Sequence, residues 1–279
     1  MSKLLISAFA DEYADLFEEQ LQALRGFGIG HIELRHLDGK NISLLGEKEV
    51  KNAKAMLDAF GIKASAIGSP LGKIKLDGDM NAHMETARRV FESANILEAK
   101  LIRIFSFYAP DGKEISDMKG EVLDSLEKLV VLARKYGVTL CHENEAKIYG
   151  DTPHRCKELL EYFEGELKCV FDMGNFVLEG VDPYAAYELL KDDIAYFHIK
   201  DALFEGAIVP AGKGDAKIQE ILLAHREYAS EDFFVSLEPH LQTFSGLNAL
   251  VGRSYTNPYQ YVDQKAAFTD AVTKFKELI

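Results

Sequence analysis

Four polar residues that can bind a metal ion or move a proton stand at the ends of four successive apolar runs in the second half of the chain. They are Glu143 in VTLCHEN, Asp172 in KCVFDMGN, His198 in IAYFHIKD and Glu238 in FFVSLEPH, separated by 29, 26 and 40 residues. Three carboxylates and one imidazole suit a hard divalent cation such as Mn²⁺ or Mg²⁺, and they are compatible with Co²⁺ or Zn²⁺. Carboxylates gathered in one cavity repel one another unless a cation or protonation offsets the repulsion, so the set predicts one bound divalent ion.

Each of these residues also has an ordinary structural interpretation. Asp172 precedes Met-Gly-Asn and could cap a helix, His198 could be a hydrogen-bonded core histidine, and Glu238, before a proline, could be a solvated strand end. Their recurrence at equivalent positions favours one shared site over four unrelated roles.

The elements that must position these residues are short β-rich runs alternating with longer amphipathic segments. Strands are predicted at 4–9, 31–35, 63–67, 101–107, 138–143, 168–172, 194–200 and 233–238. Helices are predicted at about 13–28, 47–60, 79–98, 117–136, 153–164, 183–191, 215–228 and 263–278. Eight such units without a linker or a shift in composition predict one α/β domain, residues 1–279, folded as a (β/α)8 TIM barrel.

Strand parity predicts where the candidate ligands point, because successive residues of a strand face opposite sides. In VTLCHE, the aliphatic residues Val138 and Leu140 alternate with Thr139, Cys141 and Glu143. The aliphatic residues are expected to face the helices. The same alternation applies around His198 and Glu238. We therefore expect the candidates to point into the barrel at the carboxyl ends of the strands, where catalytic groups of this fold lie.

Three further charged residues share the inward parity. Lys200 could anchor a substrate oxygen or a phosphate, or it could pair with a carboxylate of the barrel. Glu33 and Arg103 could bind substrate or form an ion pair with each other. His142 has the opposite parity to Glu143 and is assigned to packing.

A glycine-rich turn, AGKGD at 211–215, opens the seventh predicted helix. Backbone N–H groups around Gly212 and Gly214, with Lys213, could hold a phosphate or a carboxylate. A plain glycine turn with Asp215 as the helix N-cap is the favoured interpretation.

Several segments resemble the sugar phosphate isomerase/epimerase family, whose fold is the xylose isomerase-like barrel also used by endonuclease IV. They are TLCHENEAKIYGDTP, FDMGN, FHIKDA with VPAGKGD, and SLEPH, which follow the order and spacing of the family patterns over most of the chain. The resemblance implies that Glu143, Asp172, His198 and Glu238 bind one divalent metal. It also implies that Glu143 and Glu238 move a proton at the carbon beside a carbonyl, through a metal-stabilised cis-enediolate.

The chain departs from the family pattern at two positions. Asn175 stands where family members often carry histidine, and Glu145 replaces the histidine of Glu-Asn-His. An amide can hydrogen-bond a sugar hydroxyl but cannot accept a catalytic proton at neutral pH. We therefore expect Asn175 to bind substrate, and substrate recognition at this corner to differ from that of the ketose epimerases.

These observations predict a metal-dependent isomerase or epimerase of a sugar, a sugar phosphate or a keto-acid. The alternative is a lyase, such as a dehydratase of a keto-polyol, because abstraction of a proton beside a carbonyl can end in loss of a leaving group. A nuclease like endonuclease IV needs further histidines after the second and third strands, where the chain offers His36 and the segment SAIGS. A barrel that only binds a ligand is disfavoured by the complete ligand set.

Composition limits the classes of partner. The net charge of −13 repels nucleic acid and anionic lipid, and no apolar run is long enough to cross a membrane, so we expect a small-molecule carbohydrate or keto-acid partner. The three cysteines lack a C-x-x-C spacing and the N-terminus lacks signal-peptide features, which indicate a cytoplasmic protein. The sequence is also compatible with a homo-oligomer. The stretch at 240–261 is interpreted as a flap over the barrel mouth.

Overall fold

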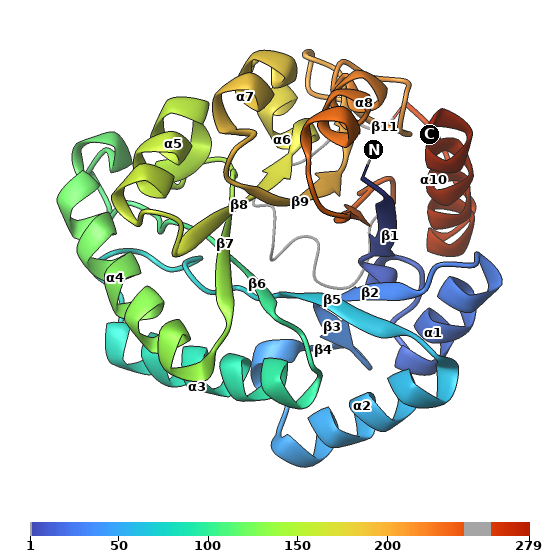
Figure 1. Cartoon of the computed structure of the whole chain (residues 1–279), viewed down its shortest axis with the longest axis horizontal. Coiled ribbons are helices and arrows are strands. Elements are labelled where there is room, and N and C mark those ends of the chain that lie inside the picture. The colour runs from blue at the N-terminus through green and yellow to red at the C-terminus, as the bar shows by residue number, and fades with distance from the viewer. Residues whose placement is uncertain (1, 243–257) are drawn as a thin grey trace.

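The computed structural model describes residues 2–242 and 258–279. Eight parallel strands form the barrel, and Figure 1 shows the helices arranged around them. The predicted single TIM barrel is confirmed. Most of the predicted flap, residues 243–257, lies outside the described residues. Among the helices that the structure describes, none has both the length and the apolar character needed to cross a bilayer.

The barrel strands are β1 (Leu4–Ala8), β2 (His31–Leu34), β5 (Lys63–Gly68), β6 (Leu101–Ile104), β7 (Thr139–Glu143), β8 (Leu167–Asp172), β9 (Ile194–Ile199) and β12 (Phe233–Leu237). Their hydrogen-bonded order is β1-β12-β9-β8-β7-β6-β5-β2, and β1 and β2 pack together to close the ring. Two short antiparallel pairs were not predicted. They are β3 (His36–Leu37) with β4 (Lys40–Asn41), and β10 (Asp201–Ala202) with β11 (Ile208–Val209).

The helices are α1 (Phe17–Gly26), α2 (Glu47–Phe60), α3 (Met80–Ile96), α4 (Lys119–Tyr136), α5 (Pro153–Tyr162), α6 (Met173–Leu178), α7 (Pro183–Leu190), α8 (Ile218–Tyr228) and α10 (Gln264–Leu278). Short 3-10 helices lie at η1 (Ala10–Glu12), η2 (Ile42–Leu44), η3 (Ile115–Asp117) and η4 (Tyr149–Asp151). Gly61 and Gly137 end α2 and α4 with φ of 68° and 65°, a left-handed conformation that glycine adopts without strain.

The hydrophobic clusters on the two faces of the barrel strands are separate, as strand parity predicts. Leu140, Phe197 and Val235 belong to the large cluster between the strands and the helices. A separate small cluster, which includes Cys141 and Tyr196, comes from residues of the opposite parity, which face the barrel interior. Because the two faces are segregated, polar side chains of the interior parity converge at one end of the barrel.

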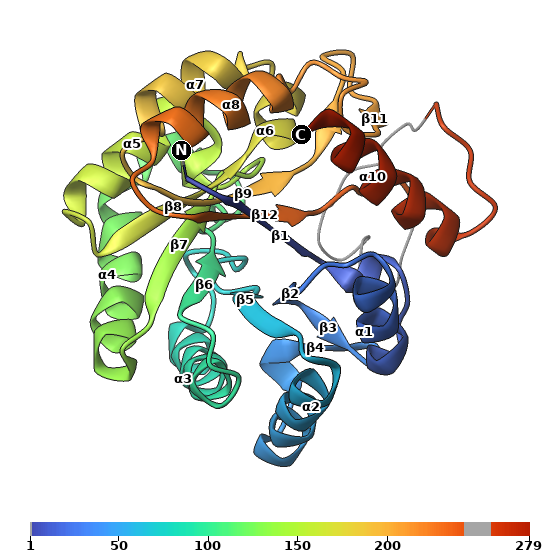
Figure 2. The ribbon, with the colours of Figure 1, turned by 45° about the vertical axis from the view of Figure 1, so that its right-hand side comes forward.

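The last helix completes the outer ring. Figure 2 shows α10 beside α1 and near β11. The Phe268 ring of α10 lies 5.9 Å from that of Tyr13 and 6.1 Å from that of Phe27, which bracket α1 in sequence. Gln219 of α8 donates to the Leu278 carbonyl at 2.7 Å. The C-terminal helix is thus anchored on both sides and covers the β1 and β12 region of the barrel.

Candidate metal and acid-base site

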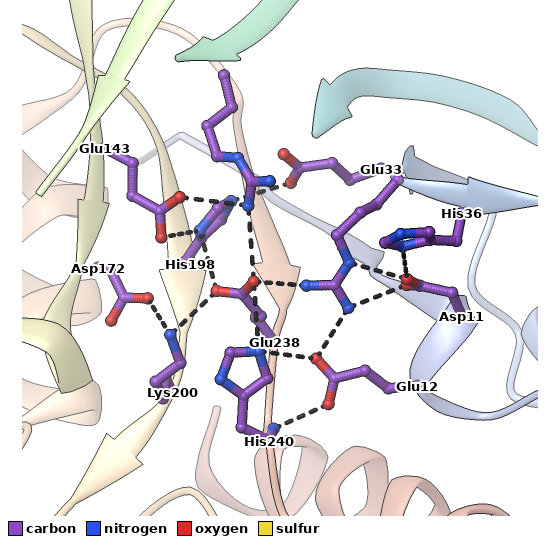
Figure 3. Close-up of polar contacts among 12 residues, drawn as sticks. Asp11, Glu12, Glu33, His36, Glu143, Asp172, His198, Lys200, Glu238 and His240 are labelled. Atoms are coloured by element: carbon purple, nitrogen blue, oxygen red, sulfur yellow. Dashed lines mark hydrogen bonds and ion pairs between the residues drawn. The ribbon is translucent and has the colours of Figure 1, made fainter. Parts of the chain in front are cut away.

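The four candidate ligands meet at the carboxyl end of the barrel. Glu143 ends β7, Asp172 ends β8, His198 lies near the end of β9, and Glu238 follows β12 directly. One ligand atom from each lies within 4.8 Å of the others, and all four side chains are buried. Figure 3 shows them gathered with Lys200 around the Glu238 carboxylate.

His198 lies between two acidic side chains. Its Nδ1 is 3.1 Å from Glu143 Oε1, and its Nε2 is 3.1 Å from Glu33 Oε2. Burial lowers the pKa of His198, but Glu33 and Glu143 raise it, and the net pKa lies well above the ordinary value. The Tyr196 hydroxyl donates to the other oxygen of Glu33 at 2.8 Å, so Glu33 is held in place from both sides.

Lys200 lies among the candidate ligands. Its Nζ donates to Asp172 Oδ2 at 2.9 Å, to Glu238 Oε2 at 3.1 Å and to Asn175 Oδ1 at 3.2 Å. Of the two roles considered for this residue, pairing with barrel carboxylates is the one seen here. The other oxygen of Asp172, Oδ1, accepts from the backbone N–H of Asn175 at 2.8 Å and caps α6. Asp172 therefore serves as a helix cap and faces the site at the same time.

Arg103 forms ion pairs with Glu143 and Glu238. Its Nη1 is 3.3 Å from Glu143 Oε2 and 3.6 Å from Glu238 Oε1. Glu33 takes His198 and Tyr196 as its partners instead. The Glu33–Arg103 ion pair considered from the sequence is therefore not formed, although both side chains do point into the barrel.

Asn175 bridges the ends of neighbouring strands. Its amide donates to the Asn144 carbonyl at 2.8 Å and lies 3.4 Å from Glu143 Oε1, while its own oxygen accepts from Lys200. Asn144, which sequence reasoning did not single out, exchanges two hydrogen bonds with the Asp172 backbone, at 2.9 and 3.0 Å. These amides fix the carboxyl ends of β7 and β8 relative to each other.

Sequence reasoning missed Arg35, a fully buried guanidinium on the β2 side of the site. It donates to Asp11 Oδ2 and to Glu238 Oε1, both at 2.8 Å, and to Glu12 Oε1 at 3.3 Å. The signal was available, because Arg35 has the inward parity of Glu33. Its partners Asp11 and Glu12 carry no such signal, since they lie in η1, where strand periodicity does not apply.

The sequence analysis also did not place two histidines near Arg35 in this site. His240 Nε2 lies 3.5 Å from both Glu12 Oε1 and Glu238 Oε1. The backbone N–H of His240 donates to Glu12 Oε2 at 2.8 Å. His36, the residue considered for a nuclease site, lies 3.0 Å from Asp11 Oδ2. Figure 3 shows His36 on the side of Glu238 away from Asp172, and His240 beside Glu238 between Lys200 and Glu12.

The internal cations correct one expectation from the sequence. Repulsion among the carboxylates was expected to require a metal ion or protonation, but Arg35, Arg103 and Lys200 already offset it. Burial raises the pKa of Glu143, yet His198 and Arg103 lower it to about 2. For Asp172, burial outweighs Lys200, and the pKa rises to about 7. The side chains of the site therefore form a network in which internal cations offset much of the repulsion among the carboxylates.

The donor set nevertheless fits a divalent ion. Three carboxylates and an imidazole within 4.8 Å of one another are the ligand types that Mn²⁺ and Mg²⁺ accept. Glu143 Oε2 is buried and accepts no hydrogen bond from the described residues, although Arg103 Nη1 lies 3.3 Å away. A buried carboxylate oxygen that accepts no hydrogen bond keeps lone pairs that a bound ion can satisfy, so this atom marks a position where an ion would be stabilising.

The glycine turn after β11 is not an open anion site. The Asp201 carboxylate accepts the N–H groups of Gly212 at 2.8 Å, Gly214 at 3.0 Å and Ala216 at 3.1 Å. An internal carboxylate thus fills the place considered for a phosphate. The expectation that Asp215 caps the next helix is wrong as well, because α8 begins three residues later and the Asp215 carboxylate accepts from Phe204.

Two neighbours of Glu143 lie outside the ligand cluster. His142 Nε2 is 2.9 Å from Ser106 Oγ, on the outward face, which agrees with its assignment to packing. Glu145, which stands in place of the family histidine, pairs with Lys73 at 3.2 Å. Lys73 in turn lies 4.2 Å from the centre of the Phe105 ring.

Comparisons with known proteins agree with the observed fold. Residues 21–253 match the model of the family described as xylose isomerase-like TIM barrel. The chain is 29% identical over 145 residues to the probable L-ribulose-5-phosphate 3-epimerase UlaE of Mycoplasma pneumoniae. That match covers 50% of this chain and 48% of the relative, so the chain spans about half the length of the curated relative it matches.

Solved structures share the fold. The D-allulose 3-epimerase from Methylomonas sp. superposes with a TM-score of 0.75 at 14% identity, covering 100% of this chain and 99% of that one. A xylose isomerase-like TIM barrel protein from Mycobacterium smegmatis, in complex with magnesium, superposes with a TM-score of 0.70 at 13% identity, covering 100% and 97%. At these identities the likeness establishes the fold alone.

Proposed function

Since the chain belongs to the xylose isomerase-like TIM barrel family, we propose that it is a divalent-metal-dependent isomerase or epimerase of a small sugar, sugar phosphate or keto-acid. The observation that carries the proposal is the convergence of Glu143, Asp172, His198 and Glu238 at the carboxyl end of the barrel, with ligand atoms within 4.8 Å. The partial match to a probable sugar-phosphate epimerase supports the class of reaction.

We propose that these four residues hold one ion, Mn²⁺ or Mg²⁺ in preference to Co²⁺ or Zn²⁺, because three of the four donors are hard carboxylates. When bound, the ion would polarise a substrate carbonyl and stabilise negative charge that develops on oxygen. His198 would have to give up its extra proton to become a ligand, and Glu33 would then accept from the remaining N–H and orient the ring.

Glu143 and Glu238 are the proposed proton-transfer groups. They come from β7 and from the end of β12, with β8 and β9 between them in the sheet, so their carboxylates enter the site from different directions. One would remove a proton beside the carbonyl and the other would return one. Arg35 holds Glu238 Oε1 at 2.8 Å and would fix the orientation of this carboxylate during the transfer.

Substrate oxygens would be bound by Asn175, Lys200 and Arg103. These side chains lie between or beside the two glutamates and carry hydrogen-bond donors suited to hydroxyl and carbonyl groups. Glu33 was considered for the same role, but its bonds to His198 and Tyr196 support a positioning role instead. Because the described cysteines are free thiols and the net charge is −13, we also propose a cytoplasmic enzyme with small-molecule partners.

A substrate screen tests this function. The purified protein would be treated with chelator, loaded in turn with Mn²⁺ or Mg²⁺, and offered ketoses, inososes, hydroxypyruvate and their phosphates, with products identified by NMR after metal removal. We expect conversion by the metal-loaded protein and none by the chelated protein. An isomerase keeps the mass of its substrate, whereas the alternative dehydratase loses water. Elemental analysis that finds no retained or rebound ion near one per chain would contradict the metal site.

A further inference from the structure

We propose that Lys200 is an exchangeable counter-cation. Its ammonium group lies among the ligand carboxylates, and it must leave them when a divalent ion binds. The inference rests on the proposed function, because it needs the four residues to be metal ligands. It goes further, because it proposes that Lys200 controls the affinity for the metal and that metal binding frees its positive charge for substrate.

The contacts of Lys200 support this assignment. Its Nζ lies 2.9 Å from Asp172 Oδ2 and 3.1 Å from Glu238 Oε2, which are oxygens of two of the four candidate ligands. The Lys200 side chain is buried, and the neighbouring residue Gly174 has no side chain that would clash with it. A Cβ added at Gly174 would lie 2.7 Å from Lys200 Cγ and 2.8 Å from the Lys200 carbonyl oxygen, so this position leaves no room for a larger residue.

The electrostatic argument follows from these distances. Metal–oxygen bonds are about 2.0–2.6 Å long, so an ion bound to the same oxygens would lie within a few ångströms of the ammonium group. Inside a buried site with weak screening, two cations at that separation repel strongly. The present position of Lys200 and an occupied metal site therefore exclude each other, and part of the free energy of metal binding is spent on displacing the lysine.

The structure also offers a way for Lys200 to move. Its third acceptor, Asn175 Oδ1 at 3.2 Å, does not belong to the candidate ligand set. The ammonium group can release the two carboxylates and keep the amide, and it would then be available to a substrate oxygen. Loading the metal would thus free a charged donor for substrate, and the metal-free protein would lack that donor.

Variants at this position separate charge from shape. Lys200→Gln removes the charge and keeps an amide donor, so we expect the dissociation constant for Mn²⁺, measured by calorimetry on chelator-treated protein, to fall about tenfold or more. Its metal-free form should melt at a lower temperature than the wild type, and its rise in melting temperature on adding Mn²⁺ should be larger. Lys200→Arg keeps the charge and should not bind Mn²⁺ more tightly. Lys73→Gln is the matched control, because Lys73 pairs with Glu145 outside the ligand cluster.

A structure of the wild-type protein with Mg²⁺ gives a test that does not depend on a variant folding. We expect Lys200 Nζ to lie beyond hydrogen-bond distance of both Asp172 and Glu238 while it remains near Asn175. The inference is overturned if Lys200 keeps both carboxylates with the ion bound, or if Lys200→Gln binds Mn²⁺ no more tightly than the wild type. Absence of Mn²⁺ binding by the wild type would instead overturn the proposed function.

Discussion

The Glu238 carboxylate is the most heavily contacted acid of the site. Its Oε1 accepts from Arg35 at 2.8 Å, and its Oε2 accepts from Lys200 at 3.1 Å and lies 3.4 Å from His198. Burial raises the pKa of Glu238, but Lys200 and the histidines around it lower the pKa well below the ordinary value. A group in this environment stays ionised, which suits a metal ligand. Its role in proton transfer must therefore be tested separately from its role as a ligand.

The Glu238→Gln variant separates the role of Glu238 in proton transfer from its role as a metal ligand. The amide keeps an oxygen near the metal but cannot accept a proton, so we expect kcat to fall by about 10²-fold or more while metal content at saturating Mn²⁺ is largely kept. Glu158→Gln, at a carboxylate that pairs with Lys119 away from the site, should leave both quantities unchanged. If activity merely follows metal occupancy and returns when Mn²⁺ is raised, Glu238 is a ligand and nothing more.

At the scale of elements, the loop after β5 depends on a neutral histidine of α3. His83 Nε2 accepts the N–H of Gly72 at 3.0 Å, and a Cβ at Gly72 would lie 1.9 Å from the Phe105 carbonyl oxygen. The loop therefore runs directly against the end of β6, and it carries Lys73. Burial lowers the pKa of His83 to about 4.

This pKa predicts acid destabilisation. In the unfolded chain the pKa is about 6.5, so the unfolded state binds the proton first as the pH falls. The contribution of His83 to stability is complete above pH 6.5 and is lost between pH 6.5 and about 4, at no more than about 1.4 kcal/mol per pH unit. His83→Gln can still accept from Gly72 and does not titrate. Urea unfolding from pH 7 to 4 should show a shallower decline for the variant, and equal slopes would contradict the assignment.

Much of this element arrangement follows from periodicity. The segment 47–60 alternates apolar and polar residues at helical spacing and ends at a glycine, and α2 has these bounds. Strand parity placed Glu143 inside the barrel and His142 outside it for the same reason. The helix α6 was missed because its six residues are too few to show a period, and the pairs β3–β4 and β10–β11 are shorter still.

The remainder of the site depends on contacts between distant segments, which periodicity does not encode. Asp11 and Glu12 reach Arg35 because β1 and β2 meet where the barrel closes. Asp201 fills the glycine turn because β11 pairs with β10 and brings the turn back beside Asp201, and neither strand parity nor the turn sequence indicates which acid does so. Sequence therefore predicts which residues line the rim, whereas the pairing of charges within the rim requires the folded structure.

At the scale of the whole molecule, the barrel buries three cations together although the chain as a whole is acidic. The chain carries a net charge of −13, yet Arg35, Arg103 and Lys200 are buried together at its carboxyl end. Such a rim can offset the charge of several carboxylates and still present donors to a polar substrate. The arrangement suits a small molecule enclosed at the barrel mouth, and the acidic exterior disfavours a polyanionic one.

The central claim, proton transfer beside a carbonyl, is tested most directly by deuterium incorporation. The substrate identified by the screen would be converted by the metal-loaded enzyme in D₂O, and the label at each carbon would be read by NMR. If Glu143 and Glu238 remove and return the proton from different directions, the returned proton comes from solvent, and the account predicts one deuterium at the carbon beside the carbonyl in each product molecule. Product formed at the normal rate without deuterium would contradict the account, and would indicate instead that hydrogen moves within the substrate.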